Sequence, residues 1–182
     1  MKILLLVLAA IILIIVAFFT YFSGFKKLKI SVMETGGELL VYEEIKGDYR
    51  QSGAVMDRIY NSLLNDDGIE TFKGFGIYYD NPRKVGKNEL RSEAGCILED
   101  KDRDKINDIK GKYTIRTYEK KNCITTEFPY KGKISVLFGI MKVYPALTKF
   151  AKENGFPEDS EVMEIYDIPD HKIIYRKTMV KE

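Results

Sequence analysis

The sequence predicts an α+β protein in which an N-terminal transmembrane helix precedes one soluble domain made of two similar β-α-β-β units. An unbroken apolar run occupies the N-terminus. About 155 residues follow it, which is enough for one domain with its own core. In that remainder, strand-like and helix-like patterns alternate in an order that occurs twice. Each unit leaves one sheet face unburied, so we expect the two to pair with two-fold pseudosymmetry around a central groove.

The N-terminal run is long enough to cross a membrane. Every residue from Ile3 to Phe19 is apolar, and the run extends to Phe22. About 20 helical residues span a hydrocarbon core of roughly 30 Å. A cleaved signal peptide is the main alternative, but the run exceeds the usual apolar region of such peptides and no small-x-small cleavage site follows. We expect residues 1–25 to be a retained anchor, in the membrane through Ile3–Phe22, and residues 29–182 to be the folded domain.

Lysines near the apolar run predict its orientation. Lys26, Lys27 and Lys29 follow the run, whereas Lys2 and the α-amino group precede it. Because positive charge is retained on the cytoplasmic side, this small excess favours a single-pass membrane protein with a cytoplasmic domain.

Composition argues against several classes of partner. Lysine and arginine number 29 and aspartate and glutamate 27, so no basic excess is available for nucleic acid. Two cysteines and one histidine do not make a common zinc site, and we expect no metal and no cofactor. A disulfide between Cys96 and Cys123 is compatible with the sequence but not required. His171 follows Pro169 and Asp170, which predicts an exposed turn residue.

The first unit begins with a strand and a helix. Leu39–Ile45 is strand-like, and Val55, Ile59 and Leu63 mark one face of a helix that ends near Gly68. The strands that follow are Phe75–Tyr79 and Leu90–Leu98, joined by a loop over residues 80–87 that contains Pro82 and Gly86. The charged segment Lys101–Lys112 is interpreted as a solvated connection to the second unit.

The second unit repeats this order. Its expected strands are Tyr113–Tyr118 and Cys123–Phe128, with Asn122 in the turn between them, and the closing hairpin Glu161–Asp167 and Lys172–Val180. Apolar residues at helical spacing from Ile134 to Ala151 predict a long helix between these pairs. Pro145 lies inside that helix and removes a hydrogen bond, so we expect a kink or a break there.

Several short segments resemble the GyrI-like superfamily, which includes the effector-binding domains of AraC-type and multidrug-sensing regulators. The matching segments are residues 76–82, 89–91, 94–96, 144–147, 153–155 and 164–166. The resemblance is greatest to a membrane-anchored branch, typified by the testis-expressed receptor of endoplasmic-reticulum autophagy. The long acidic tail that carries that receptor's autophagy motif has no counterpart before Glu182, so we do not expect that role to carry over. The resemblance implies a fold that binds small molecules in a groove.

Glu164 is the first candidate for a ligand-binding residue. Strand alternation puts it on one face with Val162 and Tyr166. The resemblance implies that it pairs with lipophilic cations, as in drug-sensing regulators, or acts as a general acid, as in relatives that hydrolyse strained cyclopropane rings. A solvated strand glutamate remains the alternative. Candidates for the aromatic wall of the groove, each equally suited to an ordinary core position, are Tyr78, Tyr130, Phe138, Tyr144 and Tyr166.

Arg91 is the other charged residue that the resemblance singles out. It follows Glu89 in a Glu-x-Arg pattern that recurs in the superfamily. It either forms a structural ion pair that holds the loop over residues 80–87 or contacts a ligand.

Three functions fit these patterns. The first is a membrane-anchored domain that binds small amphipathic or cationic molecules, which requires only the groove and Glu164. The second is a membrane-tethered scaffold for an unidentified protein partner. The third is a hydrolase of strained or electrophilic compounds that uses Glu164. An enzyme is the less favoured class, because no pairing of a nucleophile with a base is visible.

Overall fold

The computed structural model describes residues 2–180 and contains four α-helices and eight strands among them. The α-helices are α1 (Lys2–Tyr21), α2 (Ser52–Asp67), α3 (Ile106–Ile109) and α4 (Lys133–Glu153), with 3-10 turns at Tyr49–Gln51, Lys87–Glu89 and Asp100–Lys105. The strands are β1 (Ser31–Thr35), β2 (Leu39–Lys46), β3 (Lys73–Tyr78), β4 (Arg91–Leu98), β5 (Thr114–Thr117), β6 (Lys121–Pro129), β7 (Val162–Asp167) and β8 (Lys172–Thr178).

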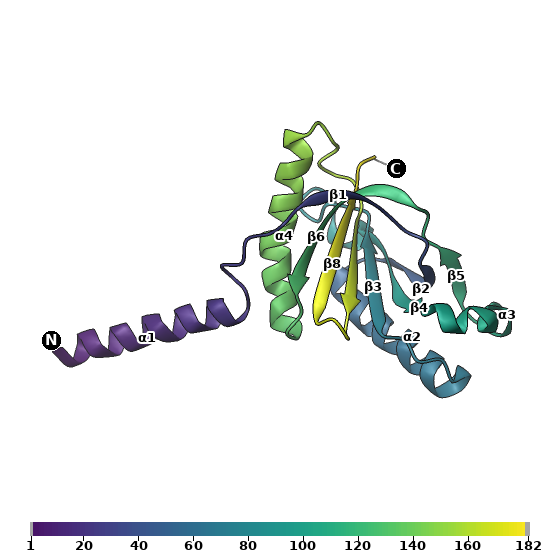
Figure 1. Ribbon diagram of the computed structural model, residues 1–182, viewed down its shortest axis with the longest axis horizontal. Coiled ribbons are helices and arrows are strands. Elements are labelled where there is room, and N and C mark those ends of the chain that lie inside the picture. The colour runs from purple at the N-terminus through teal and green to yellow at the C-terminus, as the bar shows by residue number, and fades with distance from the viewer. Residues whose placement is uncertain (1, 181–182) are drawn as a thin grey trace.

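All eight strands form one antiparallel sheet in the order β1-β6-β8-β7-β3-β4-β2-β5 (Figure 1). The element order β2-α2-β3-β4 returns as β6-α4-β7-β8, so the repeated order predicted from the sequence is confirmed. Each unit supplies three neighbouring strands, and the units join where β3 pairs with β7 at the centre of the sheet.

The expected hairpin around Asn122 is wrong. β5 pairs with β2 at one edge of the sheet, whereas β6 pairs with β1 and β8 near the other edge, and Asn122 lies within β6. Alternation of apolar and polar residues shows that a segment is a strand but does not select its partner. The chain between β5 and β6 therefore crosses from one edge of the sheet toward the other. Within this crossing, the Tyr118 N–H donates to the carbonyl of Glu38, in the β1–β2 connection, at 2.8 Å.

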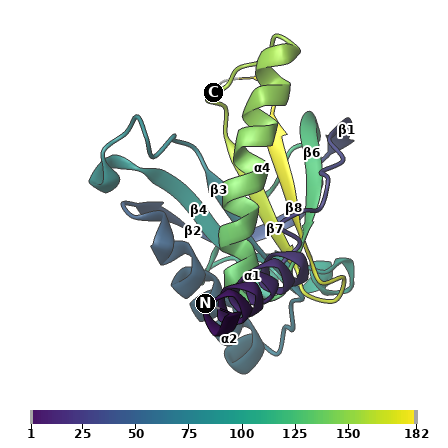
Figure 2. The ribbon, with the colours of Figure 1, turned by 90° about the vertical axis from the view of Figure 1, so that its left-hand side faces the viewer.

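Both long helices of the domain pack on the same side of the sheet (Figure 2). The predicted face of α2 is buried at Val55, Ile59 and Leu63, and the helix ends at Gly68 in the left-handed conformation, φ 63°. α4 buries every fourth residue from Ser135 to Ala151. It is continuous through Pro145, so the alternative of a break there is wrong.

The other side of the sheet has its own apolar cluster, which includes Phe75, Ile77, Met163 and Ile165. These side chains alternate along β3 and β7 with those that face the helices. Burying a side chain of this size contributes about 1.5–3 kcal/mol. The central strands are therefore buried on both faces.

α1 stands apart from this core. It has no buried residue, and 20 helical residues match a hydrocarbon thickness of roughly 30 Å. α1 and α4 are the two helices within residues 2–180 that are long and apolar enough to cross a membrane. α4 packs on the sheet as a core helix, whereas α1 projects away from the domain (Figure 1).

Candidate functional site

A large groove lies between α2 and α4, with the central strands as its floor. We call it the aromatic groove; its volume is about 1690 Å³, larger than the roughly 300–1,000 Å³ of common ligand pockets. Its lining residues include Tyr49, Ser52, Met56, Tyr60, Tyr78, Tyr130, Val136, Ile140, Met141, Tyr144, Leu147, Val162, Glu164 and Tyr166. Most of these side chains are aromatic or aliphatic, whereas charged side chains such as Asp57, Lys149 and Lys152 also line the groove. The groove therefore suits a ligand that has both an apolar and a polar part.

Glu164 is the acidic group in the floor of the groove. It lies in β7, opposite Gly76 of β3 and Tyr175 of β8. Its residue exposure is only 2%, and each carboxylate oxygen accepts a hydrogen bond from a phenol. Tyr144 Oη donates to Oε1 at 2.7 Å, and Tyr166 Oη donates to Oε2 at 2.5 Å. The solvated alternative for Glu164 is therefore wrong.

Burial controls the electrostatics of this cluster. It raises the pKa of Glu164, because the apolar surroundings disfavour the carboxylate, although the hydrogen bonds from Tyr166 and Tyr144 act in the opposite direction. Burial and the charge of Glu164 also raise the pKa of Tyr144 and of Tyr166 well above the ordinary tyrosine value. Both phenols therefore remain neutral donors to Glu164 at physiological pH.

A glycine makes room for the aromatic ring beside Glu164. A Cβ on Gly76 would lie 2.7 Å from Tyr78 Oη, so only glycine lets this ring lie over the strand. Tyr49 packs edge-on against the Tyr78 ring, with centroids 4.8 Å apart. Tyr130 packs edge-on against Tyr166, with centroids 6.0 Å apart. The aromatic wall is thus held by rings from separate segments.

Four of the five predicted aromatic residues line the groove with Glu164, namely Tyr78, Tyr130, Tyr144 and Tyr166. Phe138 is not among the lining residues of the groove. Its ring stacks on Phe22 with an interplanar angle of 7° and meets Phe19 edge-on. The position on α4 explains the difference, because the 100° step per residue turns Phe138 away from Tyr144 and toward α1.

Sequence reasoning missed Tyr49 and Tyr175. Tyr49 precedes α2 in a 3-10 turn and lines the groove. Tyr175 is buried in β8, opposite Glu164, with its ring edge-on to Tyr144. The predicted closing hairpin contained the signal for Tyr175, because in-register pairing across its turn puts residues 164 and 175 side by side.

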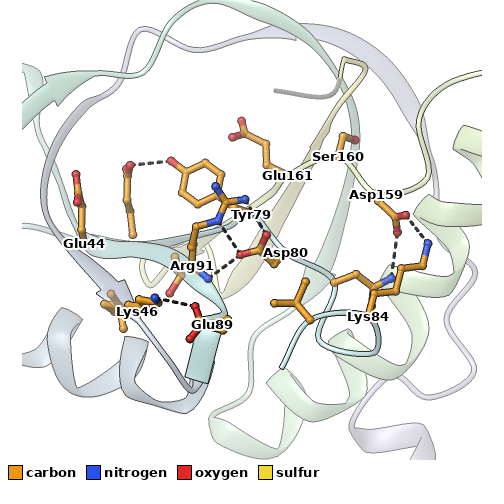
Figure 3. A pocket seen from close by; sticks show the side chains of 15 residues that line it. Glu44, Lys46, Tyr79, Asp80, Lys84, Glu89, Arg91, Asp159, Ser160 and Glu161 are labelled. Carbon is orange, nitrogen blue, oxygen red and sulfur yellow. Dashed lines mark hydrogen bonds and ion pairs between the residues drawn. The ribbon is translucent and has the colours of Figure 1, made fainter. Parts of the chain in front are cut away.

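A second hollow, which we call the polar cleft, is lined by residues of β2, β4 and the segments after β3 and before β7 (Figure 3). Asp80 and Asp159 line both the polar cleft and the aromatic groove. Its charged side chains are largely paired with one another. Arg91 donates hydrogen bonds to the Asp80 carboxylate from its backbone N–H and its guanidinium, at 2.8–3.0 Å. Lys84 pairs with Asp159, and Lys46 with Glu89. Arg91 therefore forms the structural ion pair that was one of its two predicted roles, at the start of the loop over residues 80–87.

Two acids near this cleft differ from Glu164 in their partners. Glu93 accepts from Tyr79 Oη and from Arg116 Nη2, both at 2.7 Å. Glu161 accepts from Tyr118 Oη at 3.0 Å and from Lys121 Nζ at 2.7 Å. Within residues 2–180, Glu164 has two tyrosine donors but no ion pair. It is a buried acid that is held by neutral donors alone.

The cysteines and the histidine lie apart. Cys96 and Cys123 are free and buried, and burial raises the pKa of Cys96 to about 11, which suppresses the reactive thiolate. His171 is exposed in a turn with φ 50°, as expected. Among residues 2–180, no three His, Cys, Asp or Glu side chains are placed to hold a metal ion.

Comparison with solved structures identifies the fold. The EcmrR C-terminal domain superposes with a TM-score of 0.57 at 9% identity, covering 85% of this chain and 99% of that one. SAV2435 in its complex with tetraphenylphosphonium superposes with a TM-score of 0.52 at 9% identity, covering 82% and 91%. At these identities the likeness concerns the fold, which is GyrI-like.

Comparison of sequences finds a distant relative. Testis-expressed protein 264 from Homo sapiens is 28% identical over 87 residues. The match covers 44% of this chain and 28% of the human protein, so it spans less than a third of that relative's length. No family model matches the chain.

Proposed function

We propose that this chain, whose soluble part has the GyrI-like fold, is a membrane-anchored protein that binds small cationic amphipathic molecules in the aromatic groove. In this proposal, the Glu164 carboxylate supplies the negative charge that pairs with the ligand cation. The burial of Glu164 among neutral donors alone carries the proposal. A ligand cation at that place restores the pairing that Arg116 and Lys121 give to the other two buried acids.

The aromatic wall supports the same ligand class. Tyr78, Tyr144 and Tyr166 surround the carboxylate with neutral rings and hydroxyls. Ring faces attract cations, and aliphatic side chains such as Ile140 and Met141 accept the apolar part of an amphiphile. The neighbour SAV2435 binds tetraphenylphosphonium, a large apolar cation, on the same fold.

We further propose that the groove is the central groove of a duplicated domain. The two β-α-β-β units are related by a pseudo-two-fold axis between β3 and β7, which pair at the middle of the sheet. Each unit then supplies one helix as a wall, α2 on one side and α4 on the other.

The anchor is part of the proposal. α1 is exposed, apolar and of spanning length, so we propose that Ile3–Phe22 stays in the membrane as part of an anchor over residues 1–25. Lys26, Lys27 and Lys29 keep the domain, residues 29–182, on the cytoplasmic side. Protease added to intact cells should then spare the domain. Recovery of a shortened form outside the cytoplasm would contradict this topology.

Two ions of nearly the same shape test the binding site. Tetraphenylphosphonium and tetraphenylborate differ in the sign of their charge, so we expect wild type to prefer the phosphonium in titration calorimetry with the full chain in detergent. Glu164→Gln keeps the shape of the side chain and removes its charge. A hydrogen-bonded charged pair contributes about 1.5–3 kcal/mol, so phosphonium affinity should fall roughly 10- to 100-fold, and preference over the borate should disappear.

Glu44→Gln is the matched control. Glu44 is an exposed acid at the polar cleft, so its loss changes net charge equally but should leave phosphonium affinity unchanged. Equal losses in both variants, or equal losses for both ions in Glu164→Gln, would refute the role of Glu164 as a charge reader.

The raised pKa of Glu164 favours a second function, a hydrolase in which this group is the general acid. Its protonated form has a proton to donate to a leaving group in the groove. Turnover of an electrophilic amphiphile that is abolished by Glu164→Gln and kept by Glu44→Gln would support it.

A further inference from the structure

We infer that the outer face of α4, formed by Ile134, Leu137 and Met141, is a second membrane contact that lies on the bilayer beside the anchor. The inference rests on the proposed anchor α1 and deepens the proposed function, because it names the phase from which the groove receives its ligands.

The outer face of α4 is an apolar stripe that the domain leaves uncovered. Ile134, Leu137 and Met141 follow each other at spacings of three and four residues, so they share one side of the helix. They are 47%, 57% and 66% exposed. The opposite side of α4 is packed on the sheet through Ser135, Gly139 and other buried residues. An exposed apolar stripe of this kind marks a site of contact with a partner or a membrane.

α4 packs directly against the C-terminal end of α1 and the segment that follows it. The Phe138 ring lies 5.2 Å from the Phe19 ring and 5.8 Å from the Phe22 ring, measured between centroids. Lys142 Nζ donates to the carbonyls of Gly24 and Lys26, at 2.6 Å each. These contacts hold α4 at the level where α1 leaves the hydrocarbon core.

The directions of the two helices place the outer face toward the membrane. α1 leaves the domain on the side of α4, and α4 runs across the direction of α1 (Figure 1). Seen from the side of the anchor, α4 lies in front of the sheet and α1 points toward the viewer (Figure 2). When α1 crosses the bilayer along its normal, α4 therefore lies along the bilayer surface.

Positive charge beside the outer face indicates that the lipids it contacts are anionic. Exposed lysines gather at the junction of α1 and α4, and within residues 2–180 they form no ion pair: Lys26, Lys27, Lys29, Lys131 and Lys133. Exposed aromatic side chains accompany them at Tyr21 and Phe25. Lysines next to an apolar stripe fit anionic headgroups over acyl chains, and aromatic rings are common at that depth.

The groove opens next to this face. Met141 belongs to the outer face and also lines the groove, and Lys133 and Ile140 of the same helix line it as well. An amphipathic cation concentrates at an anionic bilayer surface, so a groove with its mouth there takes the ligand from the lipid and not from bulk water.

Fluorescence on the full chain in vesicles of phosphatidylcholine and phosphatidylserine tests the inference. An environment-sensitive label is attached at Leu137→Cys, with Ile11→Cys in α1 as the reporter of the anchor. Asp108→Cys in α3, at the far end of the domain (Figure 1), is the aqueous control. Wild type serves as the labelling control, since its two cysteines are buried. Brominated lipids should quench position 137 severalfold more than position 108, and iodide should show the reverse.

A second variant excludes an effect of the label itself. Ile134→Asn with Met141→Asn makes the stripe polar at exposed positions, and lipid quenching at position 137 should then fall severalfold. Quenching at position 11 combined with control-like behaviour at position 137 would overturn the inference and leave the anchor in place. Loss of lipid quenching at position 11 would refute the anchor and the inference together. Calorimetry in detergent measures ligand binding at Glu164 without a bilayer. The proposed binding site is therefore tested independently of the membrane contact.

Discussion

The buried acids of the aromatic groove and of the polar cleft differ in their hydrogen-bond and ion-pair partners. Glu93, Glu161 and Glu164 are all buried, and each accepts a hydrogen bond from a tyrosine. At the cleft, Arg116 and Lys121 complete the pairing of Glu93 and Glu161. In the groove, a second tyrosine takes the place of the cation at Glu164.

This difference separates two acids that are paired within the fold from one that we propose pairs with a ligand. A paired buried carboxylate is costly to disturb, because removing one partner leaves the other uncompensated. A carboxylate held only by neutral donors is costly in the native state itself. Such a cost is often found at functional sites, where stability is given up for binding.

The largest expected effect is on stability at the cleft. Arg116→Met leaves Glu93 buried beside Tyr79 without its cation, so the free energy of unfolding should fall by about 2–3 kcal/mol, less than for a fully buried pair because Arg116 is partly exposed. Urea denaturation measures it. In a Glu93→Gln background the same change should cost much less. An equal cost in both backgrounds would show that the pair does not stabilise the fold.

The pH dependence of binding distinguishes the two kinds of acid. Because the pKa of Glu164 is raised, a proton competes with a ligand cation for the carboxylate. Phosphonium affinity should therefore rise with pH, by up to about tenfold per unit below the pKa of Glu164, and then level off. Calorimetry in buffers of different ionisation enthalpy should detect proton release on binding. Glu164→Gln should flatten the profile, and an unchanged profile would exclude this coupling.

Removing the unpaired charge should stabilise the empty domain. A raised folded-state pKa means that the protonated Glu164 contributes stability that is fully present below its unfolded pKa and lost as pH rises through the folded pKa. Glutamine does not titrate, so the gain of Glu164→Gln over wild type should increase with pH, on the order of 1 kcal/mol for each unit of pKa displacement. Thermal denaturation at several pH values measures this trend. A gain that shrinks with rising pH would contradict it.

The smallest effect concerns one phenol. Tyr166→Phe removes a donor to Glu164, which raises the pKa of the acid further and should weaken phosphonium binding about 3- to 10-fold at neutral pH. Tyr130→Phe is the control, because Tyr130 packs on Tyr166 only through its ring. Equal effects of the two substitutions would mean that ring contacts, and not the hydroxyl on Glu164, govern affinity.

Local patterns predicted most elements of this protein, but not β1 or α3, and the segment Lys101–Lys112, expected to be solvated, contains the buried residues Asp102 and Ile109. The apolar run from Ile3, the spacing of Val55, Ile59 and Leu63, and the closing hairpin all appear in the structure. Each depends on residues close together in the chain, where periodicity reports directly on the face that is buried. Parity along β7 likewise identified Glu164 and Tyr166 as neighbours on one face.

Only the tertiary structure decided which segments meet. The pairing of β5 with β2, and of β6 with β1 and β8, depends on side chains far apart in sequence. Tyr144 reaches Glu164 from another element, whereas Phe138, six residues earlier on the same helix, turns to the anchor. A sequence period defines a face but not what covers it, because partners are chosen by packing across the whole domain. The set of neutral donors around Glu164 is for this reason a property of the fold.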